Sequence, residues 1–283
     1  MKKKVLVLGS TGMLGHQVVN HFLKFDNYDV ADIAFKFKLR EKTVIVDVTD
    51  KVKFEKIIAK MKPDFIVNCI GILINGCKNL ENAIYLNAYF PHQLKKISKN
   101  INAKLIHIST DCVFSGEKGS YIESDVKDGK GIYSQTKKLG EIEDSTNLTL
   151  RTSIIGPELK RSGEGLFHWF MSQSADISGF TKSIWSGVTT IELAKAVKCA
   201  IEGDITGIYH VTNNIPINKY NLLKLFKKYT KKEISINQLD GEVVDKSLVD
   251  TRMLMDVDIP NYEIMIRDMI DDIKSSKMYS YKI

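Results

Sequence analysis

A short apolar run followed by closely spaced glycines most constrains the fold of this chain. Residues 5–8 are Val-Leu-Val-Leu, and residues 9–15 read Gly-Ser-Thr-Gly-Met-Leu-Gly. Apolar residues then recur at helical spacing from residue 18 to residue 23. Strand, glycine loop and helix in this order predict a dinucleotide site, because glycines let the backbone approach a pyrophosphate and a helix N-terminus attracts its charge. The predicted contacts of this loop are Gly9, Thr11, Gly12, Met13 and Leu14.

Apolar runs alternate with helical patterns through the first half of the chain. The runs predicted as further strands are residues 28–34, 44–46, 65–70, 104–108 and 148–151, and the clearest helical patterns cover residues 52–61 and 80–99. Strands that alternate with helices of these lengths predict an α/β fold with a Rossmann-type doubly wound parallel sheet. We expect residues 1–152 to form an NAD(P)-binding domain, and residues 153–283 to form mainly a smaller substrate-binding lobe that interleaves with it.

Further dinucleotide contacts are expected where the predicted strands end, because ligands of open α/β sheets bind outside the strand C-termini. Asp32 lies about twenty residues past the glycine loop, where a carboxylate accepts hydrogen bonds from the adenosine ribose. Lys36 lies just beyond and could hold a 2′-phosphate instead, so the choice between NAD(H) and NADP(H) stays open. The remaining candidates are Asp47, Val48, Cys69, Ile70 and Gly71.

A hydroxyl and a Tyr-x-x-x-Lys pair supply candidate catalytic groups. Thr110 follows the strand predicted at residues 104–108, where its hydroxyl could hydrogen-bond a substrate oxygen. Tyr133 and Lys137 are four residues apart, so on a helix they share one face. We expect the Lys137 ammonium to lower the pKa of the Tyr133 phenol. A phenol that exchanges a proton in this way suits hydride transfer to or from a carbonyl.

The charge and the cysteines limit the other classes of function. The net charge is +7, but the lysines are scattered, which is typical of a solvated surface and does not favour nucleic-acid binding. The four cysteines form no metal-ligand pattern and are expected to be thiols of a reducing cytoplasm. The apolar run at the N-terminus is too short for a signal peptide, and no apolar run is long enough to cross a membrane. We therefore expect a cytoplasmic protein with no metal site.

Three segments together resemble the extended short-chain dehydrogenase/reductases, and more narrowly the dTDP-4-dehydrorhamnose reductase family. They are the glycine loop with its G-x-x-G-x-x-G spacing, the stretch His-Ile-Ser-Thr-Asp-Cys-Val-Phe-Ser-Gly at residues 107–116, and Tyr-Ser-Gln-Thr-Lys at residues 133–137. The Ser-Thr-Asp-x-Val-Phe element is the most specific of these, and the resemblance covers most of residues 1–215.

The resemblance implies reduction of the 4-keto group of a nucleotide-linked 4-keto-6-deoxyhexose in deoxysugar or surface-polysaccharide biosynthesis. Tyr133 would donate the proton, Lys137 would bind the nicotinamide ribose, and Thr110 would hold the carbonyl. The substrate contacts carried by matching position or expected in the second half of the chain are Thr110, Asp111, Cys112, Trp185 and Arg252. Lys246 is a further candidate for the diphosphate, and a homodimer is possible for such a protein.

Two departures from the family bear on its chemistry. Gln17 stands where metal-bridged rhamnose reductases carry a glutamate, so neither the metal nor that dimer is expected. Cys112 stands where dehydratases of this type carry the acid of a Thr-Asp-Glu set, so elimination is not expected. A reductase or epimerase of a UDP-linked acetamidosugar and a non-catalytic NADP-binding regulatory subunit are kept as alternatives, because one fold hosts many functions.

Overall fold

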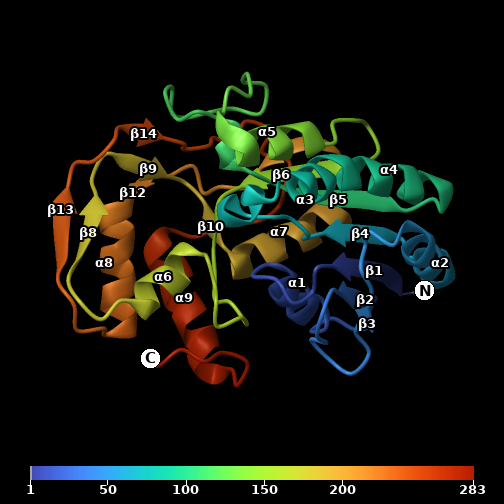
Figure 1. Ribbon diagram of the computed structural model, residues 1–283, viewed down its shortest axis with the longest axis horizontal. Coiled ribbons are helices and arrows are strands. Elements are labelled where there is room, and N and C mark those ends of the chain that lie inside the picture. Colours follow the sequence, from blue (N-terminus) through green and yellow to red (C-terminus); the bar gives the residue numbers. More distant parts are fainter. Residues whose placement is uncertain (1) are drawn as a thin grey trace.

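The central element of the computed structural model is a parallel β-sheet (Figure 1). Residues 2–283 are described, and within them the largest sheet has seven strands in the order β11-β6-β5-β4-β1-β2-β3. Its strands are β1 (Lys3–Leu8), β2 (Tyr28–Ala34), β3 (Val44–Ile45), β4 (Phe65–Asn68), β5 (Lys104–Thr110), β6 (Leu148–Thr152) and β11 (Gly207–His210). All of its neighbouring strands are parallel. This order confirms the doubly wound fold, and its switch point lies between β1 and β4.

Helices cover both faces of this sheet, as the unbroken apolar runs of its strands require. The helices are α1 (Gly15–Phe22), α2 (Lys51–Met61), α3 (Leu80–Ala83), α4 (Phe90–Asn100), α5 (Gly131–Gly140), α6 (Leu166–Ser172), α7 (Thr190–Glu202), α8 (Lys219–Thr230) and α9 (Tyr262–Ser275). Short 3-10 segments are η1 (Ile74–Lys78) and η3 (Asp111–Val113), and a π-helical segment, η2 (Ile84–Tyr89), joins α3 to α4. The helix predicted over residues 80–99 is therefore present, with a π-helical stretch that its periodicity did not reveal.

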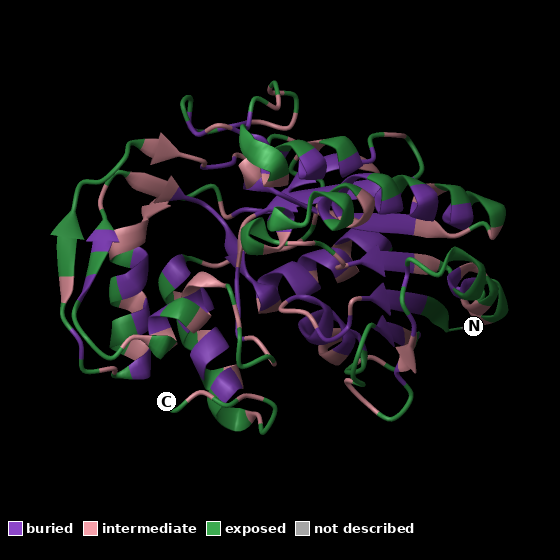
Figure 2. Cartoon of the chain, viewed as in Figure 1, coloured by how far each residue is buried: buried purple, intermediate pink, exposed green. Residues whose placement is uncertain are grey.

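The alternation of side chains along β1 shows how the two faces are built. Val5 and Val7 belong to one buried cluster with α1 and α7, whereas Leu6 and Leu8 belong to a second cluster with α2 and α4. Successive side chains of a strand point to opposite faces, so one short run supplies both layers. The central strands are accordingly buried along most of their length (Figure 2).

The second half of the chain contributes to both parts of the molecule. β11 forms one edge of the central sheet, and α7 packs against α1. The remaining elements form a lobe with α6, α8 and α9 (Figure 1). Its strands are β7 (Ile154–Ile155), β8 (Ile177–Phe180), β9 (Ser183–Trp185), β10 (Val188–Thr189), β12 (Ile217–Asn218), β13 (Ile236–Leu239) and β14 (Val244–Asp245). In residues 2–283, no helix combines the length and apolar character needed to cross a membrane.

The glycine loop follows β1 at the switch point, and its backbone passes very close to itself. Gly9 has a φ of +78°, and its carbonyl oxygen accepts a 2.9 Å hydrogen bond from the Gly12 amide. A Cβ on Gly15 would lie 2.1 Å from the Gly9 oxygen, so the first turn of α1 fits against the loop only without a side chain.

Replacing Gly15 with Ala is therefore expected to lower the free energy of unfolding by about 1–3 kcal/mol, as overpacking does in other cores. Urea denaturation measures the change. Gly203→Ala is the matched control, because the atom nearest to its new Cβ would be 3.3 Å away. Equal effects of the two substitutions would contradict the close-approach argument.

Candidate active site

Thr110, Tyr133 and Lys137 are brought together where β5 meets α5. Thr110 is the last residue of β5, and α5 carries the other two on one face. Lys137 is buried and donates a 2.8 Å hydrogen bond from Nζ to the Ile108 carbonyl of β5. The Thr110 hydroxyl is near enough to the Tyr133 phenol to act on its pKa, which it lowers. The three predicted groups therefore form one site.

The pKa of Tyr133 differs from our expectation, and the pKa of Lys137 is shifted as well. Burial raises the pKa of Tyr133, and this effect outweighs the Thr110 contact; Lys137 is not among the largest influences on it. Loss of hydration lowers the pKa of Lys137 to about 8. The prediction of a lowered Tyr133 pKa is thus wrong for this arrangement, because burial dominates. A protonated phenol is nevertheless the form that a proton donor needs.

Asp111 and Cys112 continue from Thr110 into the 3-10 turn η3. The Thr110 hydroxyl accepts a 3.1 Å bond from the Cys112 amide and donates a 3.0 Å bond to Asp111 Oδ1. Loss of hydration raises the pKa of the Cys112 thiol to about 12, with Asp111 acting in the same direction. A thiol that keeps its proton cannot take the role of a carboxylic acid–base group at this position.

The glycine loop has free donors that fit a pyrophosphate. Within residues 2–283, no acceptor takes the amide hydrogens of Thr11, Met13 and Leu14, and the buried Ser10 hydroxyl has no partner either. Outward-facing backbone N–H groups at the start of a helix are the donor set that anionic phosphates bind. A dinucleotide therefore fits here.

The other side of the switch point connects this loop to Lys137. Ile70 lies so close to Gly9 that a Cβ on Gly9 would be 3.0 Å from Ile70 Cγ1. A Cβ on Gly71 would lie 3.9 Å from Lys137 Nζ. Residues 69–71 thus join the predicted cofactor loop to Lys137.

Asn87, which the sequence did not single out as functional, holds this connection in place. Its side chain is fully buried in η2, accepts a 2.8 Å bond from the Ile72 amide, and donates a 3.0 Å bond to the Ile72 carbonyl. It also donates to the Thr136 hydroxyl on α5 at 3.3 Å. π-helical turns often occur at functional sites, but no local sequence pattern announces them.

Asp32 does not take the expected ribose-binding place. Its side chain is fully buried, and Oδ1 accepts a 2.6 Å bond from Arg40 Nε. Because this carboxylate lies inside β2 and is already used by the loop that follows, it presents no surface to a ligand. Lys36, by contrast, is exposed just past the end of β2. Asp47 is exposed and accepts bonds from Thr49, whereas Val48 is buried.

The prediction of Arg252 as a substrate contact is also wrong. Its Nη1 donates to the carbonyls of Thr206 and Ile208, both at 2.7 Å, around the start of β11. In a parallel sheet this is the edge where the strands begin, whereas Thr110 lies at the edge where they end. Arg252 therefore anchors a strand and lies at the opposite edge of the sheet from Thr110.

Trp185 and Lys246 lie in the lobe, with a lysine that the sequence did not single out. Lys219 Nζ lies 5.1 Å from the centre of the Trp185 ring. Loss of hydration lowers the pKa of Lys219, Asp111 and Cys112 oppose this shift, and Lys246 reinforces it. Within the described chain, Lys219 takes part in no ion pair. The two lysines thus bring positive charge close to Asp111 and Cys112.

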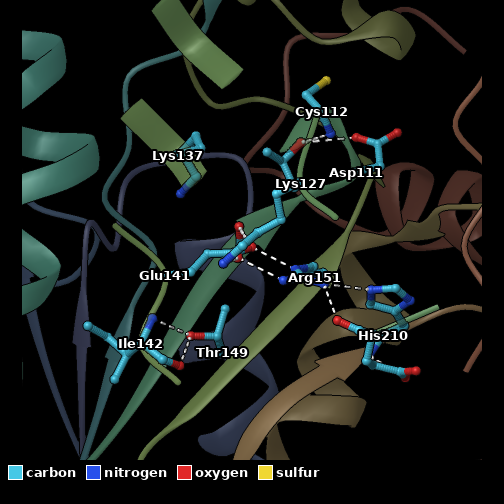
Figure 3. A network of polar contacts seen from close by, with 12 residues as sticks. Asp111, Cys112, Lys127, Lys137, Glu141, Ile142, Thr149, Arg151 and His210 are labelled. Atoms are coloured by element: carbon cyan, nitrogen blue, oxygen red, sulfur yellow. Dashed lines mark hydrogen bonds and ion pairs between the residues drawn. The ribbon is translucent and has the colours of Figure 1, made fainter. Parts of the chain in front are cut away.

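A buried ion pair fixes the end of α5 (Figure 3). Arg151 of β6 donates two bonds to the Glu141 carboxylate, at 2.7 and 2.9 Å, and the Ser109 hydroxyl donates a third at 2.7 Å. Lys127 lies 3.1 Å from the second Glu141 oxygen. Arg151, Ser109 and Lys127 together lower the pKa of Glu141, although burial opposes them. Arg151 Nη1 also donates to the Glu123 carbonyl and to His210 Nε2.

Comparisons with known proteins identify the family of this chain. The profile of the RmlD substrate-binding domain matches residues 2–242. The chain belongs to this family. The resemblance to the dTDP-4-dehydrorhamnose reductase family is thereby confirmed.

Individual relatives of this RmlD-family chain differ in their described roles. It is 30% identical over 221 residues to the spore coat polysaccharide biosynthesis protein SpsK of Bacillus subtilis, covering 75% of this chain and 74% of SpsK. It is 27% identical over 238 residues to the beta subunit of methionine adenosyltransferase 2 of Bos taurus, covering 78% and 70%. The structure of dTDP-4-dehydrorhamnose reductase from Bacillus anthracis, solved with NADP, superimposes with a TM-score of 0.82 at 21% identity, covering 96% and 99%.

Removing the charge of Glu141 tests the importance of the buried pair. Glu141→Gln leaves Arg151 without a counter-charge and is expected to lower the free energy of unfolding by about 3–5 kcal/mol. Glu143→Gln, an exposed neighbour, is the matched control and is expected to change it by less than about 0.5 kcal/mol.

The pH dependence has a defined sign. Because the folded-state pKa of Glu141 is depressed, its stabilisation is present above the unfolded pKa of about 4.3 and is lost as the pH falls through the folded value. Denaturation measured on acidification from about pH 5 should therefore show a smaller loss of stability in Glu141→Gln than in the parent protein. Equal losses would contradict this role for Glu141.

Proposed function

We propose that this protein reduces the 4-keto group of a nucleotide-diphosphate-linked 4-keto-6-deoxyhexose with a reduced nicotinamide dinucleotide. The observation that carries the proposal is the convergence of Thr110, Tyr133 and Lys137 beside a glycine loop with free amide donors. The named roles of several relatives support it, since they include polysaccharide biosynthesis and a dTDP-4-keto-6-deoxy-D-glucose reductase.

In this mechanism each catalytic residue has one task. The dinucleotide, when bound, supplies the hydride that reduces the carbonyl carbon. Tyr133 gives its phenolic proton to the carbonyl oxygen, and the raised pKa ensures that the proton is present at neutral pH. The Thr110 hydroxyl, released from Asp111, donates a hydrogen bond to the same oxygen. Donors that strengthen as negative charge develops on that oxygen lower the barrier.

Lys137 prepares the site for this proton transfer. Its ammonium stays near Gly71 and the Ile108 carbonyl, where it can bind the hydroxyls of a nicotinamide ribose. Because its pKa is lowered to about 8, it can also return a proton through those hydroxyls after Tyr133 has given one up. Lys137 thus serves both binding and proton supply.

The residues around the adenosine end favour NADPH. Asp32 is fully buried and pairs through Oδ1 with Arg40, so its negative charge is offset where a 2′-phosphate would bind. Lys36 and Lys38 are exposed in the loop after β2 and carry the charge that such a phosphate attracts. The same assay that tests the reduction therefore compares NADPH with NADH.

Tyr133→Phe tests the proton donor. We expect turnover to fall by about 10²- to 10⁴-fold, because general acid catalysis supplies that factor, while dinucleotide affinity stays within about twofold. The assay follows loss of reduced-nicotinamide absorbance with a panel of dTDP- and UDP-linked 4-keto-6-deoxy sugars, and a separate titration measures dinucleotide binding. Undiminished turnover in the variant would reject the role of Tyr133.

The same assay with the parent protein distinguishes the reductase from a second candidate function. The likeness to a methionine adenosyltransferase beta subunit makes a non-catalytic dinucleotide-binding partner the alternative. Dinucleotide binding without oxidation by any sugar of the panel would favour that alternative. Oxidation with one of the sugars would establish the reductase and identify its nucleotide.

We also propose that Lys219 binds an anionic oxygen of the substrate. It is half-buried beside Trp185, is not paired with a carboxylate in the described chain, and faces Asp111 and Cys112 from the lobe. A poorly hydrated cation in such a place is stabilised by an anion, and the diphosphate supplies one.

Lys219→Met should raise the KM for the sugar nucleotide by about tenfold, the effect of losing one charged hydrogen bond, while the KM for the dinucleotide is unchanged. Lys224→Met is the matched control, because Lys224 also lies on α8 over an aromatic ring, that of Tyr220 at 5.4 Å, but is exposed. Steady-state kinetics with both substrates varied measure these constants. Equal KM values for the two variants would refute the assignment.

A further inference from the structure

The residues after α9 fold back onto the glycine-loop region. Tyr279 Oη accepts a 2.7 Å bond from Gln17 Nε2 and lies 2.9 Å from His16 Nε2, both on α1. The His16 and Tyr279 rings are also in edge-to-face contact, with centroids 5.6 Å apart. Two residues of α1 thus meet one tyrosine that lies more than 250 positions later in the chain.

The hydrogen bonds of this contact have one consistent direction. His16 Nδ1 lies 2.8 Å from the Gly12 carbonyl oxygen, which can only accept, so Nδ1 carries the ring proton. Burial lowers the pKa of His16, so the ring is neutral and Nε2 accepts the proton of Tyr279. The chain therefore runs from Gln17 to Tyr279, from Tyr279 to His16, and from His16 to the Gly12 carbonyl.

Gln17 has a second hydrogen-bond partner, which holds its amide in place between α1 and α9. Its buried amide also donates a 3.1 Å bond to Asp272 Oδ2 of α9. The residue that departs from the metal-bridging pattern in the sequence is thus used inside this chain, where it joins α1 to α9 and to Tyr279.

A second tyrosine extends the contact to the opposite side of the loop. Tyr281 Oη accepts a 3.0 Å bond from the Glu158 amide and lies 3.0 Å from His168 Nδ1. Glu158 in turn accepts a 2.7 Å bond from the Gly165 amide, and a Cβ on Gly165 would lie 2.5 Å from Met13 Cε. Residues 279–281 therefore hold both α1 and the segment that packs against Met13.

We propose that Tyr279 is a positioning residue for the dinucleotide site, acting through His16 on the Gly12 carbonyl to hold the glycine loop in its binding conformation. The proposal rests on the proposed function for its ligand. Neither Tyr279 nor His16 needs to touch the dinucleotide. Their effect is to keep a loop of three glycines, which is flexible by composition, in one conformation before the ligand arrives.

The first test is Tyr279→Phe, which keeps the ring and removes only the hydroxyl. We expect the Kd for NADPH to rise by about tenfold, with the loss in the KM for the dinucleotide and not in kcat. Tyr229→Phe is the matched control, because the Tyr229 hydroxyl bonds to Glu263 on the surface at 2.9 Å, away from the loop. Thermal melting of both variants shows that they are folded.

A double-mutant cycle tests whether Tyr279 acts on the glycine loop through His16. If Tyr279 acts through His16, Tyr279→Phe should weaken NADPH binding in the parent protein but add no further loss in a His16→Ala background. Additive losses would overturn the proposal, as would equal Kd values for Tyr279→Phe and Tyr229→Phe.

Hydrogen–deuterium exchange without ligand keeps this test independent of the proposed function. Tyr279→Phe should increase exchange of the hydrogen-bonded amides of Gly12 and His16 and leave the central strands unchanged. Unchanged exchange in the loop would overturn the proposal even if the parent protein bound no dinucleotide. Failure of the parent protein to bind NADPH or NADH would instead count against the proposed function.

Discussion

The buried pair of Glu141 and Arg151 is the interaction on which the site depends. Glu141 ends α5, the helix that carries Tyr133 and Lys137, and Arg151 belongs to β6. Two opposite charges removed from water are tolerated only when each keeps its partner and its hydrogen bonds. This requirement fixes the end of α5 against β5 and β6, so Tyr133 is held opposite Thr110. Arg151 also contacts His210 (Figure 3). It donates as well to the Glu123 carbonyl, which ties the long segment after β5 to the same frame.

Several charged residues that the sequence offers as ligand contacts instead stabilise the fold. Asp32 and Arg252 have the charge and the sequence position of ligand contacts, yet each is used within the protein, by Arg40 and by backbone carbonyls respectively. Lys137 and Lys219 differ from them because their ammonium groups are poorly hydrated and, within residues 2–283, form no ion pair with a carboxylate. An ionic group that the fold leaves without a counter-charge is the better candidate for ligand binding.

The organisation of the chain explains how the two ends of the site are held together. β11 and α7 return from the second half to complete the central sheet and cover α1, and the residues after α9 return to α1 itself. The glycine loop is consequently supported by segments from both ends of the sequence. The lobe that carries Trp185 and Lys219 is connected through α9 and Tyr279 to the loop that would hold the dinucleotide.

The sequence by itself determined the α/β fold, the glycine loop and the meeting of Thr110, Tyr133 and Lys137. These features depend on local patterns: apolar runs, glycine spacing and the four-residue repeat of a helix face. Only the tertiary structure decided that Asp32 and Arg252 are occupied, that Asn87 joins Gly71–Ile72 to α5, and that burial raises the Tyr133 pKa. It alone also revealed the contact of Tyr279 with His16. The physical reason is that desolvation and hydrogen-bond partners are set by residues far apart in the chain, which local patterns do not contain.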